Sequence, residues 1–244
     1  KNNITVVNGG PGTGKTTFAI KECLTDNTLV IVPTQTLKRE WEEKLKTRKN
    51  KDFKVTVATY QVAFTRAYIY DTLIIDESCL LGFPYCFSAW CTFGWPNTFL
   101  LGDPKQIGYI DFEKLPVMAH PLHDIKNHDY LETVTLNWCY RCPRDVVAVL
   151  NKCYGYNLVP QSNIEKSIFI LNKIEEPEGK SLVFTQNSKS TYASKDIPSA
   201  TVHESQGSTF PVVTLTLTED AMPLIDRSKS HYIVGISRHT EKLF

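Results

Sequence analysis

The stretch from Gly9 to Thr16, GGPGTGKT, fits the pattern G-x-x-x-x-G-K-[ST] of a phosphate-binding loop. Its glycines allow a tight turn in which backbone N–H groups point inward at an anion. Lys15 can reach the β- and γ-phosphates of a nucleotide, and the Thr16 hydroxyl can ligate Mg²⁺. The sequence therefore predicts a site for ATP or another NTP with Mg²⁺ as cofactor. The predicted nucleotide contacts are Gly10, Pro11, Gly12, Thr13, Gly14, Lys15, Thr16 and Thr17.

Two acids form the second chemical element. The segment 71–77, DTLIIDE, is an apolar strand that ends in Asp76 and Glu77. We expect Asp76 to hold Mg²⁺ through water, together with Thr16, and Glu77 to act as general base for the attacking water. Two surface acids that cap a strand are the alternative. The abrupt end of an apolar strand in Asp-Glu, downstream of a phosphate-binding loop, favours catalysis.

The elements that must position these residues alternate between strand and helix. Apolar runs predict strands at 4–7, 28–32, 54–58, 71–75, 98–101 and 133–136. Helical patterns follow at 16–24 and 37–45, so the sequence predicts an α/β fold with a parallel sheet. Functional residues are then expected at the carboxyl ends of the strands, where Pro33, Thr59 and Asp76 fall. Gln106, at the polar tip that follows the strand at 98–101, is predicted to sense the γ-phosphate.

A second domain is predicted after Leu136. Pro143 suits the first turn of a helix, and strands are predicted at 167–171, 181–185 and 212–217. The segment contains no second phosphate-binding loop, so we do not expect it to bind its own nucleotide in the same way. The predicted domains are therefore residues 1–136 and residues 137–244.

The composition is that of a folded protein with ordinary cores. The chain has 244 residues, 42% of them hydrophobic, and a net charge of +1. The sequence contains no apolar run of membrane-spanning length and no signal peptide, so no direct membrane span is expected. Because the chain begins at Lys1 and a strand follows almost at once, we expect a piece of a larger polypeptide.

Seven cysteines without a secretory signal favour reduced thiols. A zinc site could be imagined from Cys139-x-x-Cys142 together with Cys86 and Cys91, or with His123 and His128. The spacings fit no standard finger, so ordinary buried thiols are the preferred interpretation. The three histidines from His120 to His128 are interpreted as loop residues.

Two further segments have alternative interpretations. The aromatic segment 79–96 is interpreted as a helix and loop packed on the sheet, with a base-stacking surface as the alternative. The basic run 44–54 is interpreted as a solvated helix end and loop, with an RNA contact as the alternative.

Seven segments, in order, resemble the motifs of superfamily 1 helicases. The resemblance is strongest to the helicase domain of replication proteins from alphavirus-like and tobamovirus-like plus-strand RNA viruses, and it covers nearly the whole chain. The matching segments are 9–17, 31–34, 75–77, 101–106, 140–143, 201–209 and 234–240. The Tyr-Arg-Cys-Pro segment at 140–143 and the Ser-Arg-His-Thr segment at 237–240 favour the viral group over cellular relatives.

The resemblance implies two RecA-like domains of the P-loop NTPase fold with the nucleotide between them. Arg141 and Arg238 would then act as arginine fingers on the γ-phosphate, and surface ion pairs are the alternative for each. Gln206 and Gly207 would link the nucleotide to RNA. The implied RNA contacts are Pro33, Thr34, Thr59 and Tyr60 from domain 1, and Thr185, Thr201 and His203 from domain 2. Hydroxyls at strand ends are also common helix caps.

The function implied by this resemblance is an NTP-dependent RNA helicase of viral genome replication that moves 5′ to 3′ on single-stranded RNA. The same site would also act as an RNA 5′-triphosphatase in some members. The implied partners are single-stranded RNA and other domains of a viral replication polyprotein, in replication complexes of the host-cell cytoplasm. The alternatives are an RNA-binding NTPase of the movement-protein kind that does not unwind, and a P-loop phosphotransferase with a small-molecule acceptor.

Overall fold

The computed structural model describes residues 4–48, 52–65, 68–94, 96–108, 131–172 and 176–244. The chain divides into two compact units. The first unit comprises 1–9, 14–104 and 108–136, and the second comprises 10–13, 105–107 and 137–244. The tip of the phosphate-binding loop and the segment around Gln106 therefore group with the C-terminal residues.

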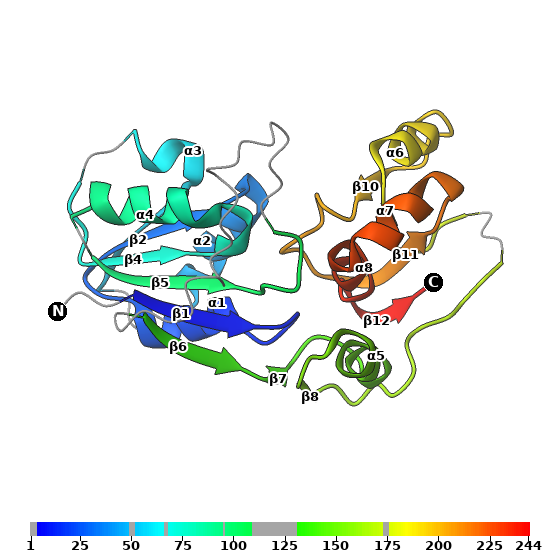
Figure 1. Ribbon diagram of the computed structural model, residues 1–244, viewed down its shortest axis with the longest axis horizontal. Helices are drawn as coiled ribbons and strands as arrows, with labels where there is room; N and C mark the ends of the chain where they lie inside the picture. The colour runs from blue at the N-terminus through cyan, green and yellow to red at the C-terminus, as the bar shows by residue number, and fades with distance from the viewer. Residues whose placement is uncertain (1–3, 49–51, 66–67, 95, 109–130, 173–175) are drawn as a thin grey trace. The chain divides into compact units, whose positions relative to one another are not determined.

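The first unit is built on a six-stranded sheet with the order β3-β2-β4-β5-β1-β6 (Figure 1). All of its strand pairs are parallel, which confirms the predicted sheet type. The strands are β1 (Ile4–Gly9), β2 (Asn27–Val32), β3 (Lys54–Thr59), β4 (Thr72–Ile75), β5 (Asn97–Gly102) and β6 (Leu131–Leu136). Because β2 and β4 lie inside the sheet, both of their faces are buried and their sequences are continuously apolar.

Helices cover both faces of this sheet. They are α1 (Lys15–Phe18) with a π-helical turn (Ala19–Cys23), α2 (Gln35–Lys46), α3 (Tyr60–Ala63), a 3₁₀ turn (Ser78–Leu80) and α4 (Gly82–Thr92). Ala19 and Trp41 pack with Val30 in one core cluster, which places α1 and α2 on one face. Ala63 and Phe93 belong to a second cluster, so α3 and the end of α4 cover the other face.

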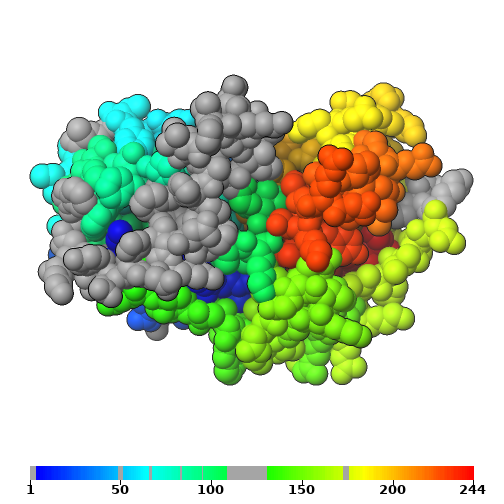
Figure 2. Space-filling view, in the orientation of Figure 1, coloured from blue at the N-terminus to red at the C-terminus, as the bar shows by residue number. Residues whose placement is uncertain are grey.

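The second unit contains a four-stranded parallel sheet with the order β10-β9-β11-β12. Its elements are β7 (Trp138–Cys139), α5 (Arg144–Tyr154), β8 (Val159–Pro160), β9 (Lys180–Val183), α6 (Gln186–Ala193), β10 (Ser199–Thr201), β11 (Phe210–Thr216), a 3₁₀ turn (Glu219–Ala221), α7 (Met222–Arg227), α8 (Lys229–Ile236) and β12 (His239–Leu243). In Figure 2, α6 in yellow and α7 in orange form part of the outer surface of this unit.

The predicted strand at 167–171 is wrong. Only Ile168 forms a single bridge, to Leu243, while Ile170 is 91% exposed. The Asp145 carboxylate accepts the backbone N–H groups of Ser167 at 2.6 Å and Ile168 at 2.9 Å. Ser167 and Phe169 do bond the backbone of Leu243 in β12, but Asp145 takes the N–H groups of Ser167 and Ile168, so the pairing does not extend beyond this one bridge.

Two other expectations are refined. The helix expected at 16–24 is α-helical only to Phe18 and then widens into the π-helical turn. Within the aromatic segment, Cys86, Ala89 and Phe93 are buried in the core, which confirms a packing role for that part. None of the helices in the described part of the chain is long and apolar enough to cross a membrane.

Candidate functional site

The phosphate-binding loop connects β1 to α1. Gly12 and Gly14 have φ values of +69° and +79°, in the left-handed region that favours glycine. The Lys15 ammonium donates to the Gly9 carbonyl at 2.8 Å, and the Thr13 hydroxyl donates to the Gly10 carbonyl at 2.9 Å. These two contacts fix the turn from within. The helix α1 begins at Lys15, and a helix N-terminus favours an anion.

Asp76 follows β4 and lies directly against this loop. Its side chain is buried, and Oδ2 accepts hydrogen bonds from Trp41 Nε1 at 2.7 Å and from Thr16 Oγ1 at 3.3 Å. Oδ1 accepts the backbone N–H of Glu77 at 2.9 Å. The structure therefore brings Thr16 and Asp76 together, 60 residues apart in sequence.

The pKa of Asp76 is set by opposing effects of burial and of nearby hydrogen-bond donors and charges. Burial raises the pKa of this carboxyl group, and the neighbouring charge of Glu77 raises it further. The Trp41 hydrogen bond and the Lys15 charge act in the opposite direction and favour the ionised form. Glu77 itself is buried and has φ +52°, a strained backbone for a residue other than glycine, which is a common feature of functional sites.

The residues present fit Mg²⁺. A hydroxyl and a carboxylate oxygen are the hard ligands that this ion prefers, and it usually keeps several waters. In the described residues, no group of three or more His, Cys, Asp and Glu side chains could hold a metal. Cys139 and Cys142 are buried free thiols. His120, His123 and His128 lie outside the described residues.

Sequence reasoning missed Trp41 as a site residue. It lies in the helix predicted at 37–45, and its side chain is fully buried in the core. An indole can be both core packing and a hydrogen-bond donor, and only the fold shows which carboxylate its N–H reaches. Asp103 was also missed, although it lies within the quoted segment 101–106, and it is buried beside Cys79.

The second unit holds Arg238 in a dense set of hydrogen bonds. The side chain is 1% exposed, and Nε donates to the Val234 carbonyl at 3.0 Å. Nη1 donates to the Ser208 carbonyl at 3.2 Å, and Nη2 donates to Gln106 Oε1 at 3.3 Å. The structure therefore brings together two of the residues that were predicted to respond to the γ-phosphate.

Arg141 lies against the tip of the phosphate-binding loop within the same unit. The Tyr140 N–H donates to the Gly12 carbonyl at 2.9 Å, and a Cβ added at Gly12 would lie 2.6 Å from Arg141 Cβ. Only glycine fits at that point. Arg141 Nη1 donates to Thr209 Oγ1 at 2.9 Å, while its buried Nε has no hydrogen-bond partner in the described residues.

Two more predicted residues lie in this unit. Gln206 is buried and its Nε2 donates to the Ile107 carbonyl at 3.2 Å, and Gly207 has φ +89°. Cys142 lies beside Cys139, whose thiol donates to the Pro11 carbonyl at 3.1 Å.

Most of the hydroxyls predicted to contact RNA also make hydrogen bonds within the protein. Thr34 caps α2 by accepting the Leu37 N–H at 3.2 Å, and Thr185 caps α6. Thr201 accepts the Glu204 N–H at 3.2 Å and is buried, as is Thr59. By exposure, the described candidates best placed to meet a ligand are Thr34 and His203, while Pro33, Tyr60 and Thr185 are half-buried.

A parallel α/β sheet with a phosphate-binding loop at β1 and an Asp-Glu pair after β4 defines a P-loop nucleotide-binding protein. Residues 5–244 match the model of the viral superfamily 1 RNA helicase core domain, and the chain belongs to that family.

Relatives and solved structures agree with this assignment. The chain is 28% identical over 265 residues to the replicase large subunit of Pepper mild mottle virus (strain Spain), covering 98% of this chain and 16% of that protein. It is 32% identical over 237 residues to the non-structural polyprotein pORF1 of Hepatitis E virus genotype 1 (isolate Human/India/Hyderabad), covering 96% of this chain and 12% of the polyprotein. The chain therefore spans less than a fifth of the length of either viral protein.

Two solved helicases share the fold. The PRRSV helicase has a TM-score of 0.72 at 19% identity, over 99% of this chain and 51% of that one. The Pif1 helicase from Bacteroides, solved in complex with ADP-AlF3 and ssDNA, has a TM-score of 0.60 at 12% identity, over 99% of this chain and 88% of that one. Both likenesses support the predicted RecA-like fold.

Proposed function

We propose that this chain is an NTP-dependent RNA helicase and translocase of viral genome replication. The observation that carries the proposal is the buried Asp76 carboxylate, which accepts a hydrogen bond from Thr16 of the phosphate-binding loop. Thr16 and Asp76 would hold a magnesium ion, which would neutralise charge on the phosphates of the nucleotide. Family membership then supplies the reason for coupling hydrolysis to nucleic acid.

Each predicted residue has a proposed role in this reaction. Lys15 binds the β- and γ-phosphates, and Glu77 accepts a proton from the attacking water. Arg238 and Arg141 stabilise the charge that develops on the γ-phosphoryl group, and Gln106, which accepts from Arg238, reports its presence. Gln206 and Gly207 carry that information toward the RNA.

The RNA contacts, the 5′-to-3′ direction and the RNA 5′-triphosphatase activity are parts of the same proposal. Pro33, Thr34, Thr59 and Tyr60 would contact RNA from the first unit, and Thr185, Thr201 and His203 from the second. The Pif1 relative, by its description, binds ADP-AlF3 and single-stranded DNA, which supports a nucleotide and a single strand as ligands here. We place the protein in replication complexes of the host-cell cytoplasm, as one domain of a larger polyprotein.

The test is NTP hydrolysis by the wild-type chain and by Lys15→Ala, each with and without single-stranded RNA. We expect turnover that rises with RNA and is lost in the variant. Unwinding of duplexes with a 5′ or a 3′ single-stranded tail then tests strand separation and direction. Turnover that ignores RNA would contradict the proposed coupling, and RNA-stimulated turnover without strand separation would favour a non-unwinding RNA-binding NTPase.

A further inference from the structure

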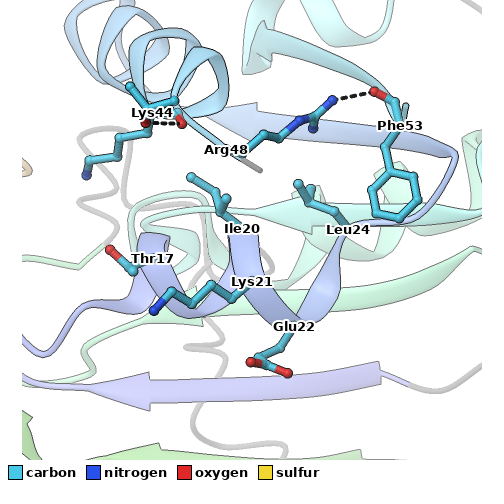
Figure 3. Close-up of a pocket in the computed structure, with 9 residues that line it drawn as sticks. Thr17, Ile20, Lys21, Glu22, Leu24, Lys44, Arg48 and Phe53 are labelled. Atoms are coloured by element: carbon cyan, nitrogen blue, oxygen red, sulfur yellow. Dashed lines mark hydrogen bonds between the residues drawn. The ribbon is translucent and has the colours of Figure 1, made fainter. Parts of the chain in front are cut away.

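Two arginine side chains in the described residues have a buried nitrogen without a hydrogen-bond partner, Arg48 at Nη1 and Arg141 at Nε. Arg48 lies beside a cavity of about 590 Å³ between α1 and the end of α2, where its guanidinium donates to the Phe53 carbonyl (Figure 3). A cavity of that size admits water, which can accept from the remaining nitrogen. Arg141 differs, because a buried acceptor in its neighbourhood also lacks a partner.

That acceptor is Nδ1 of His239. The imidazole is fully buried, and its Nε2 lies 2.9 Å from Ser167 Oγ. The Ser167 hydroxyl gives its one proton to Asp145 Oδ1 at 2.7 Å, so it accepts from Nε2–H. Burial lowers the pKa of His239 from 6.5 to about 4, and the ring is therefore neutral near pH 7. In this tautomer Nδ1 carries a lone pair, and it bonds no other group within the described part of the chain.

Arg141 and His239 are neighbours in the second unit. Arg141 Nη1 donates to Thr209 Oγ1 at 2.9 Å, and Thr209 directly precedes Phe210, the first residue of β11. Phe210 is the register partner of His239 at the start of β12. The guanidinium and the imidazole therefore lie at the same end of the sheet. The charge of Arg141 is close enough to contribute to the pKa of His239.

The two groups are complementary, since Arg141 Nε–H is a donor only and the neutral His239 Nδ1 is an acceptor only. Leaving either one unsatisfied in the interior is costly, and one contact between them would satisfy both. A rotation of the Arg141 side chain, or one water molecule between the two atoms, makes that contact. An arginine that stabilises phosphoryl transfer has to present its planar fork in one orientation, and a contact at Nε fixes that orientation.

We propose that His239 is a positioning residue for Arg141: its Nδ1 accepts the Arg141 Nε–H and holds the guanidinium toward the γ-phosphate when nucleotide is bound. Asp145 and Ser167 keep the imidazole in the tautomer that this contact needs. The inference rests on the proposed function, because it takes Arg141 as an arginine that acts on the γ-phosphoryl group.

Two variants of His239 separate the two contacts of the ring. The amide of glutamine reaches the position of Nε2 and can still donate to Ser167, whereas the amide oxygen of asparagine offers an acceptor at the position of Nδ1. We expect His239→Gln to lower kcat of NTP hydrolysis by about 10- to 100-fold with little change in KM. His239→Asn should keep most of kcat. A purely structural role predicts the opposite order, because asparagine loses the contact with Ser167.

A double-mutant cycle tests whether His239 acts through Arg141. Arg141→Ala removes the Nε–H, so His239→Gln added to it should lower kcat no further. Circular dichroism and AMP-PNP binding check that each variant is folded.

Ser167→Ala is a second route to the same contact, because it leaves His239 in place and removes the hydroxyl that sets its tautomer. This variant should also lower kcat, by less than His239→Gln does. Ser181→Ala is the matched control, since the Ser181 hydroxyl is buried in the same unit and bonds no group that the structure describes. Its kcat should equal that of the wild type.

The outcomes separate this inference from the proposed function. Wild-type kcat in Arg141→Ala would contradict the role of Arg141 in the proposed function, and this inference with it. A large loss in Arg141→Ala with unchanged kcat in His239→Gln overturns the inference and leaves the proposed function standing. Equal losses in the glutamine and asparagine variants, or a further loss in the double variant, assign His239 to structure alone. If His239→Gln does not fold, wild-type kcat in Ser167→Ala overturns the inference, as does an equal loss in Ser181→Ala.

Discussion

At the scale of single residues, the hydrogen bond from Trp41 orients the Asp76 carboxylate, which we propose as a ligand of Mg²⁺. The indole N–H lies 2.7 Å from Oδ2 in a fully buried position, and it opposes the rise in pKa that burial causes. Donors behind a metal ligand orient it, and losing one typically costs about 10- to 100-fold in metal affinity.

Trp41→Phe should therefore weaken Mg²⁺ binding by about 10- to 100-fold while keeping most of the packing. The measurement is the Mg²⁺ concentration that gives half-maximal NTP hydrolysis, together with a Mg²⁺ titration of nucleotide binding. Leu37→Ala is the control, because Leu37 belongs to the same core cluster and its side chain does not bond Asp76 in the described contacts. Equal Mg²⁺ dependence in both variants would contradict the role given to the indole.

Arg141 supports a second prediction at this scale. Its buried Nε has no partner among the described residues, and it adjoins the loop tip at Gly12. Arg141→Ala should lower the rate of NTP hydrolysis by about 10³-fold, the usual loss for an arginine that stabilises phosphoryl transfer. Arg144→Ala is the matched control, since Arg144 is exposed and its side chain bonds only the Ser162 carbonyl in the described contacts. Nucleotide affinity should change little in either variant, and a matching loss of rate in Arg144→Ala would refute the assignment.

At the scale of elements, the residue at the start of α2, Thr34, has two proposed roles. Thr34 caps this helix, and it is also the exposed hydroxyl that we propose as an RNA contact. Thr34→Ala should lower the free energy of unfolding by about 1 kcal/mol through loss of the cap. That variant alone cannot separate the cap from the RNA contact.

Thr34→Asp separates the two roles. Aspartate is a good N-cap and its charge suits the helix dipole, so the free energy of unfolding should equal or exceed that of the wild type. The same charge repels RNA phosphates, so binding of single-stranded RNA should weaken. Urea unfolding and an RNA titration measure the two effects. RNA binding that is unchanged in Thr34→Asp would remove Thr34 from the RNA-binding surface.

Elements also show how far the sequence could predict this fold. Continuous apolar runs identified β2 and β4 because both faces of these strands are buried. The run at 167–171 looked similar but forms only one bridge to β12, because Asp145 accepts the N–H groups of Ser167 and Ile168. That contact joins residues 22 positions apart, so no local pattern could reveal it. The hydrogen bond from Trp41 to Asp76 escaped prediction for the same reason.

At the scale of the whole molecule, the stability of the protein depends on pH through the buried His239 of the second unit. His239 is fully buried, and its Nε2 lies 2.9 Å from Ser167 Oγ. Because the Ser167 hydroxyl donates to Asp145, it accepts from Nε2–H, which defines the neutral tautomer. Burial lowers the pKa of His239 from 6.5 to about 4; Asp145 opposes that change and Arg141 adds to it.

The unfolded chain therefore takes up a proton at His239 between pH 6.5 and 4, while the folded chain does not. The stability that depends on neutral His239 is fully present above pH 6.5 and is lost as the pH falls toward 4. The expected loss is about 3 kcal/mol over that range. Asp145, whose pKa is lowered mainly by its hydrogen bonds to Ser167, loses its contribution only below its ordinary value of 3.8.

Urea unfolding between pH 7.5 and 4.5, followed by circular dichroism, measures this dependence. The wild type should lose stability steadily below pH 6.5, and His239→Gln should show a flatter slope because glutamine takes up no proton. His231 is also buried and its pKa is also lowered, chiefly by burial, so His231→Gln should flatten the slope by its own share. A His239→Gln chain with the wild-type slope would show that other groups govern the acid sensitivity of the protein.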